Sequence, residues 1–523
     1  METLCYPIIY IRGYAMSEGE RDETTADPFC GFNLGSTVYR ASVNKEDKPK
    51  KFIFESPLLR LNNEFGYSDV YENGADIIDP DWKPSGTNIG IPAQSIIIYR
   101  YYDNGSQLLG DGRSEDIENY AKGLSDLILR VRDLVVAQDG IKPEDFKCYL
   151  VAHSMGGLVV RGFLQNKKLG SDIARKTVDK VFTYATPHNG IDMAGINVPS
   201  WLSWNKMNTF SRENMAKFLD MEDVYKKYKR VDFIPKADFP IDRIFCMVGT
   251  NRADYEVAHG VSRTFAGHGS DGLVKIENAS LWGLDENNET THSAATAYTY
   301  RSHSGFFGIV NSEEAYQCLK RFLFGDVRID LWLQIDKVEL PPDLDGKNVE
   351  ALYQFEMRAG PRGKRWFLTR RVAEEDSTAC RTHQQLTDPA QIPAKSIYMS
   401  TVFLANSARV NKNDPSLSYA MDIGVRVPDY LVDKSFWPKQ HYEGAYLFRD
   451  GLIVTMTPPQ TPGGEWFVDY GWQSEAVGRA VRNVDYSDLG KGKLEILIPF
   501  ANKVAPGVSG SVQLIVSAWN QDA

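Results

Sequence analysis

The sequence predicts an α/β protein with two domains. Residues 1–326 are expected to form a mainly parallel β-sheet with helices on both faces, and residues 327–523 a second, β-rich, sandwich-like domain. In the first part, short β-branched and aromatic runs alternate with stretches of helical spacing, which is the pattern of a parallel sheet. In the second part, apolar and polar residues alternate with a period of two, which indicates antiparallel strands.

The first part divides into strands, helices and two longer excursions. An insertion that is polar and contains glycine extends from the first strand to about residue 92. The stretch of about 190–240 is apolar and partly helical, and its place between two strands predicts a lid over an active site; a helical insertion that only buries its own face is the alternative. Strands are expected at 7–11, 95–102, 146–152, 180–185 and 243–248, and helices at 114–137, 158–165 and 313–324.

The second part contains several short strand-like runs. Arg449-Asp450-Gly451 lies between two of them and is interpreted as a hairpin turn, because Asp-Gly commonly occupies such turns. Strands are expected at 329–335, 397–404, 421–427, 446–448, 452–456, 494–498 and 512–516.

Composition excludes several classes of function. The net charge is −10 with both signs interspersed, which argues against nucleic-acid binding and against electrostatic docking on anionic membranes. The composition is compatible with a transient contact with a lipid surface, and it does not indicate the oligomeric state. The six cysteines show no short metal spacing, so no disulfide framework, metal or cofactor is expected. No signal peptide or membrane span is apparent, which predicts a cytoplasmic protein, with non-classical export as the alternative.

The segment Leu150–Leu158 carries the strongest chemical signal. A hydrophobic strand leads into a small-x-Ser-x-Gly turn and directly into a helix, with Ser154 at the turn. Such a turn exposes a serine hydroxyl above the sheet, and small residues two positions to either side let strand and helix approach closely. Ala152 replaces the usual first glycine but keeps the side chain small. Ser154 is therefore the candidate nucleophile.

A serine nucleophile needs a histidine as base. His303 is the first candidate, because it lies in a loop just before the last helix of the α/β part, where the base belongs in the chain order Ser, Asp, His. His292 is the second choice, and His259 and His268 fit surface positions. His153 adjoins the nucleophile and is set aside because it cannot reach back to it.

The acid and the oxyanion hole complete the candidate site. Asp271, in a turn after the strand at 243–248, is the expected acid, which orients the imidazole; Asp254 is its rival, and a mere turn-forming role is the alternative. The backbone N–H of Met155 is one expected oxyanion donor. The second is expected from the loop after the first strand, at Tyr14.

These segments together resemble the bacterial lipases and related serine esterases of the α/β-hydrolase fold. The family's Ala-His-Ser-Met-Gly-Gly elbow matches residues 152–157, and its acid motif matches 271–274; weaker likeness is found at 186–190 and 310–313. The resemblance implies an α/β-hydrolase fold and cleavage of carboxylic esters. Some family members hold calcium near the acid and histidine, but no carboxylate follows His303 directly, so no calcium is expected. Arg12 stands where these lipases usually carry histidine, and it either braces the loop or binds an acidic group on the substrate.

The expected function is hydrolysis of lipid or small-molecule esters through an acyl-enzyme. The same residues would serve an esterase, a lipase or a phospholipase, and equally an amidase, a thioesterase or an acyltransferase. A lipid-degrading toxin whose C-terminal β domain binds a partner is the alternative from another class.

Overall fold

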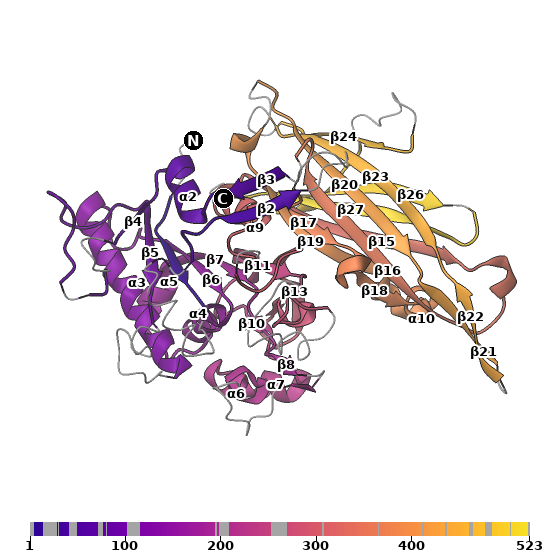
Figure 1. The fold of residues 1–523 in the computed structure, drawn as a ribbon, viewed down its shortest axis with the longest axis horizontal. Helices are drawn as coiled ribbons and strands as arrows, with labels where there is room; N and C mark the ends of the chain where they lie inside the picture. The colour runs from indigo at the N-terminus through magenta and orange to yellow at the C-terminus, as the bar shows by residue number, and fades with distance from the viewer. Residues whose placement is uncertain are drawn as a thin grey trace. The chain divides into compact units, whose positions relative to one another are not determined.

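The computed structural model divides the chain into two compact units (Figure 1). Unit 1 comprises Met1–Thr296 and Arg301–Leu319, and unit 2 comprises Ala297–Tyr300 and Lys320–Ala523. The structure describes residues 5–13, 29, 31–40, 50–71, 77–79, 81–101, 116–193, 196–197, 209–252, 269–305, 308–364, 366–409, 413–434, 437–459, 464–475, 484–502 and 504–520.

A seven-stranded sheet has the order β14-β11-β7-β6-β1-β5-β4; its six strands from β11 to β4 belong to unit 1, and β14 has residues of both units. All pairings from β11 to β4 are parallel. Its central strands are buried along their whole length, as expected of a sheet covered on both faces. The strands are β1 (Ile8–Ile11), β4 (Ser68–Asp69), β5 (Ser95–Tyr99), β6 (Cys148–His153), β7 (Val178–Tyr184), β11 (Ile244–Gly249) and β14 (Ala295–Thr299).

Helices pack beside this sheet, and the longest of them, α3, shows why they form. Its apolar residues recur every three or four positions and are buried, and it ends at Gly140 in the left-handed conformation. It begins at Ile117, after Asp116, rather than near the predicted Ser114, which lies outside the described residues. The helices are α2 (Pro57–Phe65), α3 (Ile117–Asp139), α4 (Met155–Gln165), α5 (Asp172–Thr177), α6 (Arg212–Phe218), α7 (Glu222–Tyr228) and α9 (Glu313–Phe324).

Unit 1 therefore has the predicted parallel sheet and helices, an arrangement that fits an α/β-hydrolase fold. Two of its parts differ from the sequence expectation. The sheet continues beyond 243–248 with β14. The stretch before residue 92, expected as an insertion, contributes α2, β4 and the hairpin of β2 (Ser36–Arg40) and β3 (Lys50–Phe54).

Within the expected lid, the described residues form the short strands β8 (Asp192–Met193) and β9 (Ile196–Asn197), two short helices, α6 and α7, and the strand β10 (Phe233–Pro235). The side chain of Arg161, on α4, anchors the far end of this segment. Its guanidinium is buried and donates to the backbone carbonyls of His188, Val231 and Phe233. β10 pairs with β12 (Trp282–Leu284), which pairs with β13 (Thr290–Ser293); β8 (Asp192–Met193) pairs with β9 (Ile196–Asn197).

Unit 2 consists mainly of two antiparallel sheets. The first has the order β19-β15-β27-β26-β25, and the second has the order β22-β21-β16-β20-β23-β24, with β17 and β18 also pairing with β16. The rings of Phe448 and Phe500 meet between the sheets, with centroids 4.8 Å apart. The strands are β15 (Val327–Glu339), β16 (Val349–Pro361), β17 (Thr369–Arg371), β18 (Ala379–Thr382), β19 (Ser396–Leu404), β20 (Leu417–Arg426), β21 (Asp429–Lys434), β22 (Trp437–Glu443), β23 (Tyr446–Thr457), β24 (Phe467–Trp472), β25 (Ser487–Gly490), β26 (Lys493–Asn502) and β27 (Gly507–Ala518).

The hairpin turn predicted at Arg449-Asp450-Gly451 is wrong. β23 runs without interruption through these residues and pairs with β20 along them. Glycine is needed at position 451 of the strand because the side chain of Gln473 occupies the space that a Cβ atom would need. The glycine of this Asp-Gly pair leaves room for the side chain of Gln473, and the chain does not turn here.

Among the described residues, no helix has both the length and the apolar character needed to cross a bilayer.

Candidate active site

Ser154 lies on a sharp turn between a strand and a helix. β6 ends at His153, and α4 begins at Met155. Ser154 itself has φ 52° and ψ −126°, a conformation that is strained for a residue with a side chain. Its N–H donates to the carbonyl of Tyr184 on β7 at 2.9 Å, which fixes the turn at the carboxyl edge of the sheet.

Two glycines explain why small residues surround this serine. A Cβ atom on Gly156 would collide with the carbonyl oxygen of Ile11, at the end of β1. A Cβ atom on Gly13 would lie 2.6 Å from the Cβ atom of Ser154. The close packing of strand, turn and helix therefore requires glycine at both positions; the small-x-Ser-x-Gly pattern predicts this for Gly156.

His303 faces the serine hydroxyl. Its Nε2 is 2.9 Å from Ser154 Oγ, and its side chain is only 4% exposed. The backbone of its loop is also held, since the N–H of His303 donates to the carbonyl of Asp271 at 3.0 Å and that of Ile309 donates to the carbonyl of Ser302. The ring is thus held at hydrogen-bond distance from the hydroxyl.

Asp271 lies on the opposite side of the imidazole. Its Oδ2 is 2.9 Å from His303 Nδ1, while Oδ1 accepts hydrogen bonds from the backbone N–H groups of Leu273 and Val274. Its Cβ atom packs against Gly249, the last residue of β11. Both carboxylate oxygens are engaged, so the carboxylate has one defined orientation toward the ring.

The structure separates His303 from its competitors. His292 is 48% exposed and pairs at 3.1 Å with Asp242 on the surface. His259, His268 and the rival acid Asp254 lie outside the described residues.

A contribution of His153 was missed by sequence reasoning. The side chain is buried, and its Nε2 is 2.9 Å from the backbone carbonyl oxygen of His303, to which it must donate. Burial, together with the neighbouring His303 and Arg12, lowers the pKa of His153 well below its usual range, so the ring stays neutral. Its place beside Ser154 pointed to the site, but only the fold shows which way the ring turns.

The oxyanion region is described in part. Met155 is the first residue of α4, and the first N–H groups of a helix have no partner within it, so this N–H is available to an anion. Tyr14, the second expected donor, lies outside the described residues. Arg12 lines a cavity of about 180 Å³ together with His153 and Gly305, and its carbonyl accepts a hydrogen bond from the hydroxyl of Tyr101.

Among the described residues, no group of three or more His, Cys, Asp or Glu side chains has an arrangement that could hold a metal ion.

No protein-family model and no curated protein matches this sequence. Among solved structures, the chain is similar to a lipase of Bacillus licheniformis in its mature form, with 14% identity and a TM-score of 0.27 over 59% of this chain and 87% of that one. It is also similar to a gene product of Listeria innocua, with 12% identity and a TM-score of 0.26 over 61% of this chain and 94% of that one.

Proposed function

We propose that this protein is a serine hydrolase that cleaves carboxylic esters, such as those of acylglycerols or phospholipids. The observation that carries the proposal is the hydrogen-bonded series Ser154–His303–Asp271, with 2.9 Å at each step and both donor–acceptor pairs buried. A nucleophile, a base and an orienting acid at these distances are what acyl transfer through an activated serine requires.

In the proposed reaction, Ser154 Oγ attacks the ester carbonyl while His303 Nε2 takes its proton. Asp271 holds the Nδ1–H tautomer and stabilises the imidazolium without accepting the proton. The oxyanion receives hydrogen bonds from the N–H of Met155 and, as the sequence predicts, of Tyr14. The leaving alcohol takes the proton from His303, and an acyl-enzyme remains.

Hydrolysis of the acyl-enzyme repeats these steps with water as the nucleophile. His303 removes a proton from the water and returns it to Ser154 Oγ as the acid leaves. The strained conformation of Ser154 supports this role, because strain of this kind persists where the surrounding structure enforces a functional geometry.

The test combines active-site labelling with a substrate panel. A fluorophosphonate probe should label the protein, and Ser154→Ala should remove both labelling and hydrolysis of p-nitrophenyl esters. The panel runs from acetate to laurate beside phospholipids and simple amides. Esters should be cleaved far faster than amides; the opposite ranking would make the protein an amidase.

The chain offers a matched control for the base. His303→Ala should lower kcat by several orders of magnitude, because the hydroxyl then stays protonated. His292→Ala should leave kcat unchanged, since that ring is exposed and pairs with Asp242. If His292→Ala lowered kcat and His303→Ala did not, the assignment of His303 as the base would be overturned.

A further inference from the structure

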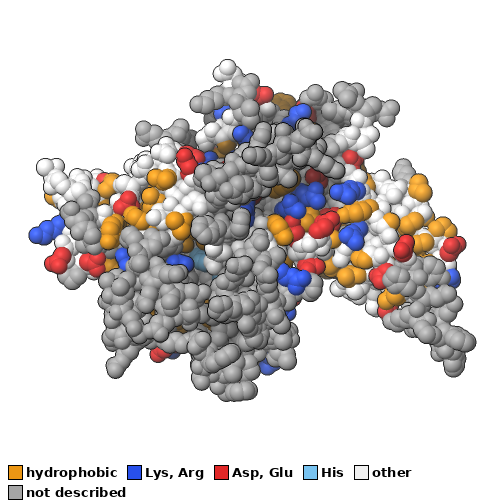
Figure 2. Space-filling model, viewed as in Figure 1, with side chains coloured by type: hydrophobic (Ala, Val, Ile, Leu, Met, Phe, Trp, Pro, Cys, Tyr) orange, Lys and Arg blue, Asp and Glu red, His pale blue; other side chains and the backbone are white. Residues whose placement is uncertain are grey.

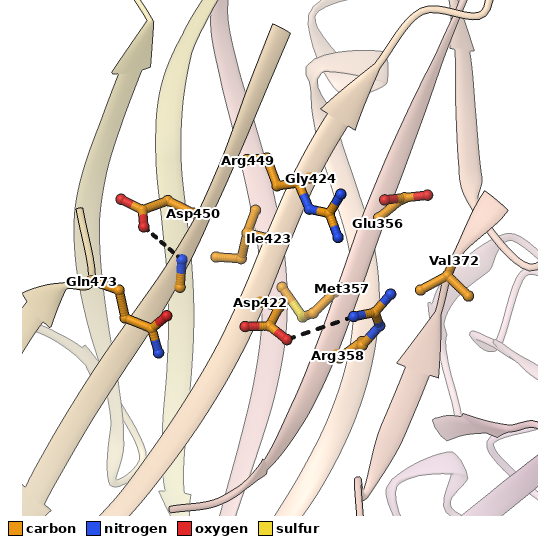
Figure 3. A pocket seen from close by; sticks show the side chains of 11 residues that line it. Glu356, Met357, Arg358, Val372, Asp422, Ile423, Gly424, Arg449, Asp450 and Gln473 are labelled. Atoms are coloured by element: carbon orange, nitrogen blue, oxygen red, sulfur yellow. Dashed lines mark hydrogen bonds and ion pairs between the residues drawn. The ribbon is translucent and has the colours of Figure 1, made fainter. Parts of the chain in front are cut away.

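A polar pocket opens on one face of the larger sheet of unit 2, and it contains none of the residues of the proposed active site. Its volume is about 380 Å³, which is within the usual range for small-molecule sites. Most of its lining residues lie on β16, β20 and β23, and Val372, after β17, and Gln473, after β24, complete it (Figure 3). Unlike most such sites, its lining is dominated by charged and amide groups.

Two glycines lie inside the strands that line the pocket. Gly424 on β20 lies between Glu356 on β16 and Arg449 on β23 in the strand register, so one side chain is missing from the middle of that row. In the adjacent row, Gly451 lies opposite Asp422. Glycine in a strand interior costs stability and often marks a place where a ligand or another group approaches closely.

The groups around the hollow alternate in hydrogen-bonding character. Arg358 and Asp422 face each other with 3.8 Å between nitrogen and oxygen, and the Nε of Arg358 is buried without a hydrogen-bond partner among the described residues. The guanidinium of Arg449 extends over Gly424 toward Glu356 (Figure 3) and lies 4.9 Å from the ring centroid of Tyr446.

One carboxylate of the pocket is fixed in place. Glu356 is 6% exposed and accepts hydrogen bonds from the backbone N–H of Ala373 and from the hydroxyl of Tyr446, each at 2.8 Å. Across the hollow, the amide of Gln473 lies over Gly451. A ligand in the hollow would therefore meet guanidinium and amide donors beside carboxylate and amide acceptors.

The charges of the lining select the class of ligand. Two carboxylates, of Glu356 and Asp422, stand against the guanidinium groups of Arg358 and Arg449, while the carboxylate of Asp450 accepts hydrogen bonds from the N–H of Gly451 and from Ser474. A phosphate or carboxylate would face the two acids, and a cation would face the two arginines. An apolar molecule would leave these groups unpaired and dehydrated. On the face drawn in Figure 2, acidic and basic side chains of unit 2 are intermingled.

We propose that this pocket binds a neutral sugar unit. Each sugar hydroxyl offers one donor and two acceptor positions, which suits a lining in which donors and acceptors alternate. The hydroxyls would pair with the guanidinium of Arg358, with Asp422 and with the Gln473 amide. Unit 2 then attaches the protein to a glycan or a glycosylated substrate, and this role does not depend on the chemistry proposed for Ser154.

The experiment titrates the full chain with the methyl glycosides of glucose, galactose, mannose and N-acetylglucosamine. Saturation-transfer NMR detects contact, and calorimetry gives the Kd. At least one glycoside should bind with a millimolar Kd or tighter and give saturation transfer to its ring protons. Inorganic phosphate at the same concentration should not compete. Failure of all four glycosides to bind, or displacement by phosphate, would overturn the proposal.

Variants locate the binding. Gly424→Leu should weaken it at least tenfold by filling the hollow, and Asp422→Asn should weaken it at least tenfold by removing an acceptor. Gly424 has an ordinary strand conformation, so Gly424→Ala gives a milder version of the first change if leucine disturbs folding. Glu465→Gln, an exposed acid elsewhere in unit 2, is the matched charge control and should bind normally. Equal affinity in Asp422→Asn and wild type would place the sugar elsewhere and refute the site.

Discussion

His153 Nε2 donates a hydrogen bond to the backbone carbonyl of His303, 2.9 Å away, and thereby ties the residue before Ser154 to the loop that holds His303. The two rings lie side by side with centroids 5.0 Å apart. This contact involves no atom that reacts in the proposed mechanism, so we propose that His153 positions the His303 loop.

The first prediction concerns this contact. His153→Phe should lower kcat about fivefold with little change in KM, because one hydrogen bond worth about 1 kcal/mol no longer fixes the His303 loop. His153→Gln retains an amide donor and should recover part of the loss. Steady-state kinetics with a p-nitrophenyl ester measure both. An unchanged kcat in His153→Phe would show that the contact has no role in positioning.

The second prediction separates strain from chemistry at the turn. Ser154→Gly and Ser154→Ala should both be inactive, because neither has a hydroxyl. The free energy of unfolding of Ser154→Gly should nevertheless be about 1 kcal/mol higher than that of Ser154→Ala, since glycine adopts φ 52° without the clash that a Cβ atom causes. Urea unfolding of the two variants gives the difference. Equal stabilities would mean that the turn is not strained.

The third prediction concerns the acid. Asp271→Asn should lower kcat by about 10³–10⁴, because an amide favours the wrong tautomer of His303. Asp242→Asn is the matched control, since Asp242 also pairs with a histidine, His292, but at the surface; its kcat should be unchanged. Asp254→Asn should be close to neutral. If Asp254→Asn proved the more damaging of the two, Asp254 would replace Asp271 as the acid.

The fourth prediction is a loss of stability in mild acid. Burial lowers the pKa of both His153 and His188 well below the usual range, with further lowering by His303 and Arg12 at the first and by Arg161 at the second. Below about pH 6.5 the unfolded chain binds protons that the folded chain excludes. The free energy of unfolding should therefore be insensitive to these histidines above pH 7. It should fall by up to about 1.4 kcal/mol per pH unit for each as the pH drops below 6.5.

Urea unfolding between pH 7.5 and 5.5 checks this effect. His153→Gln should show a shallower pH dependence than wild type, because one of the two buried histidines is gone. His292→Gln is the control and should retain the wild-type slope, since His292 is exposed. If His153→Gln kept the wild-type pH dependence, the proton that the chain takes up on unfolding would not be bound by His153.

The parts of the site that follow from local pattern were accessible from the sequence. The elbow at Ser154 needs a strand, a tight turn and a helix in succession, and each leaves a signal within a few residues. The distances among Ser154, His303 and Asp271 depend instead on how distant strands align, and motif likeness could only suggest them. The direction of the His153 ring could not be predicted, because adjacent residues of a strand usually point to opposite sides, and this rule would turn His153 away from Ser154.

The main misreadings arose where tertiary contacts outweigh local preference. Asp450-Gly451 has the composition of a turn, but both residues lie within β23. The glycine is explained by the side chain of Gln473, which occupies its side-chain position. β14 was overlooked because Ala295–Thr299 alternates small and polar residues and lacks the apolar run of the other sheet strands. Its burial at the end of the sheet comes from its neighbours and not from its own hydrophobicity.

Ser154 and His303 are separated by 149 residues along the chain. A nascent chain that has emerged from the ribosome only as far as the elbow carries a serine hydroxyl with no base to activate it. Under the proposed mechanism, the enzyme is silent throughout most of the synthesis of unit 1 and gains activity only when its last loop is added and folded. Chains that end before His303 would then pose no hydrolytic hazard to the esters of the cell that makes them.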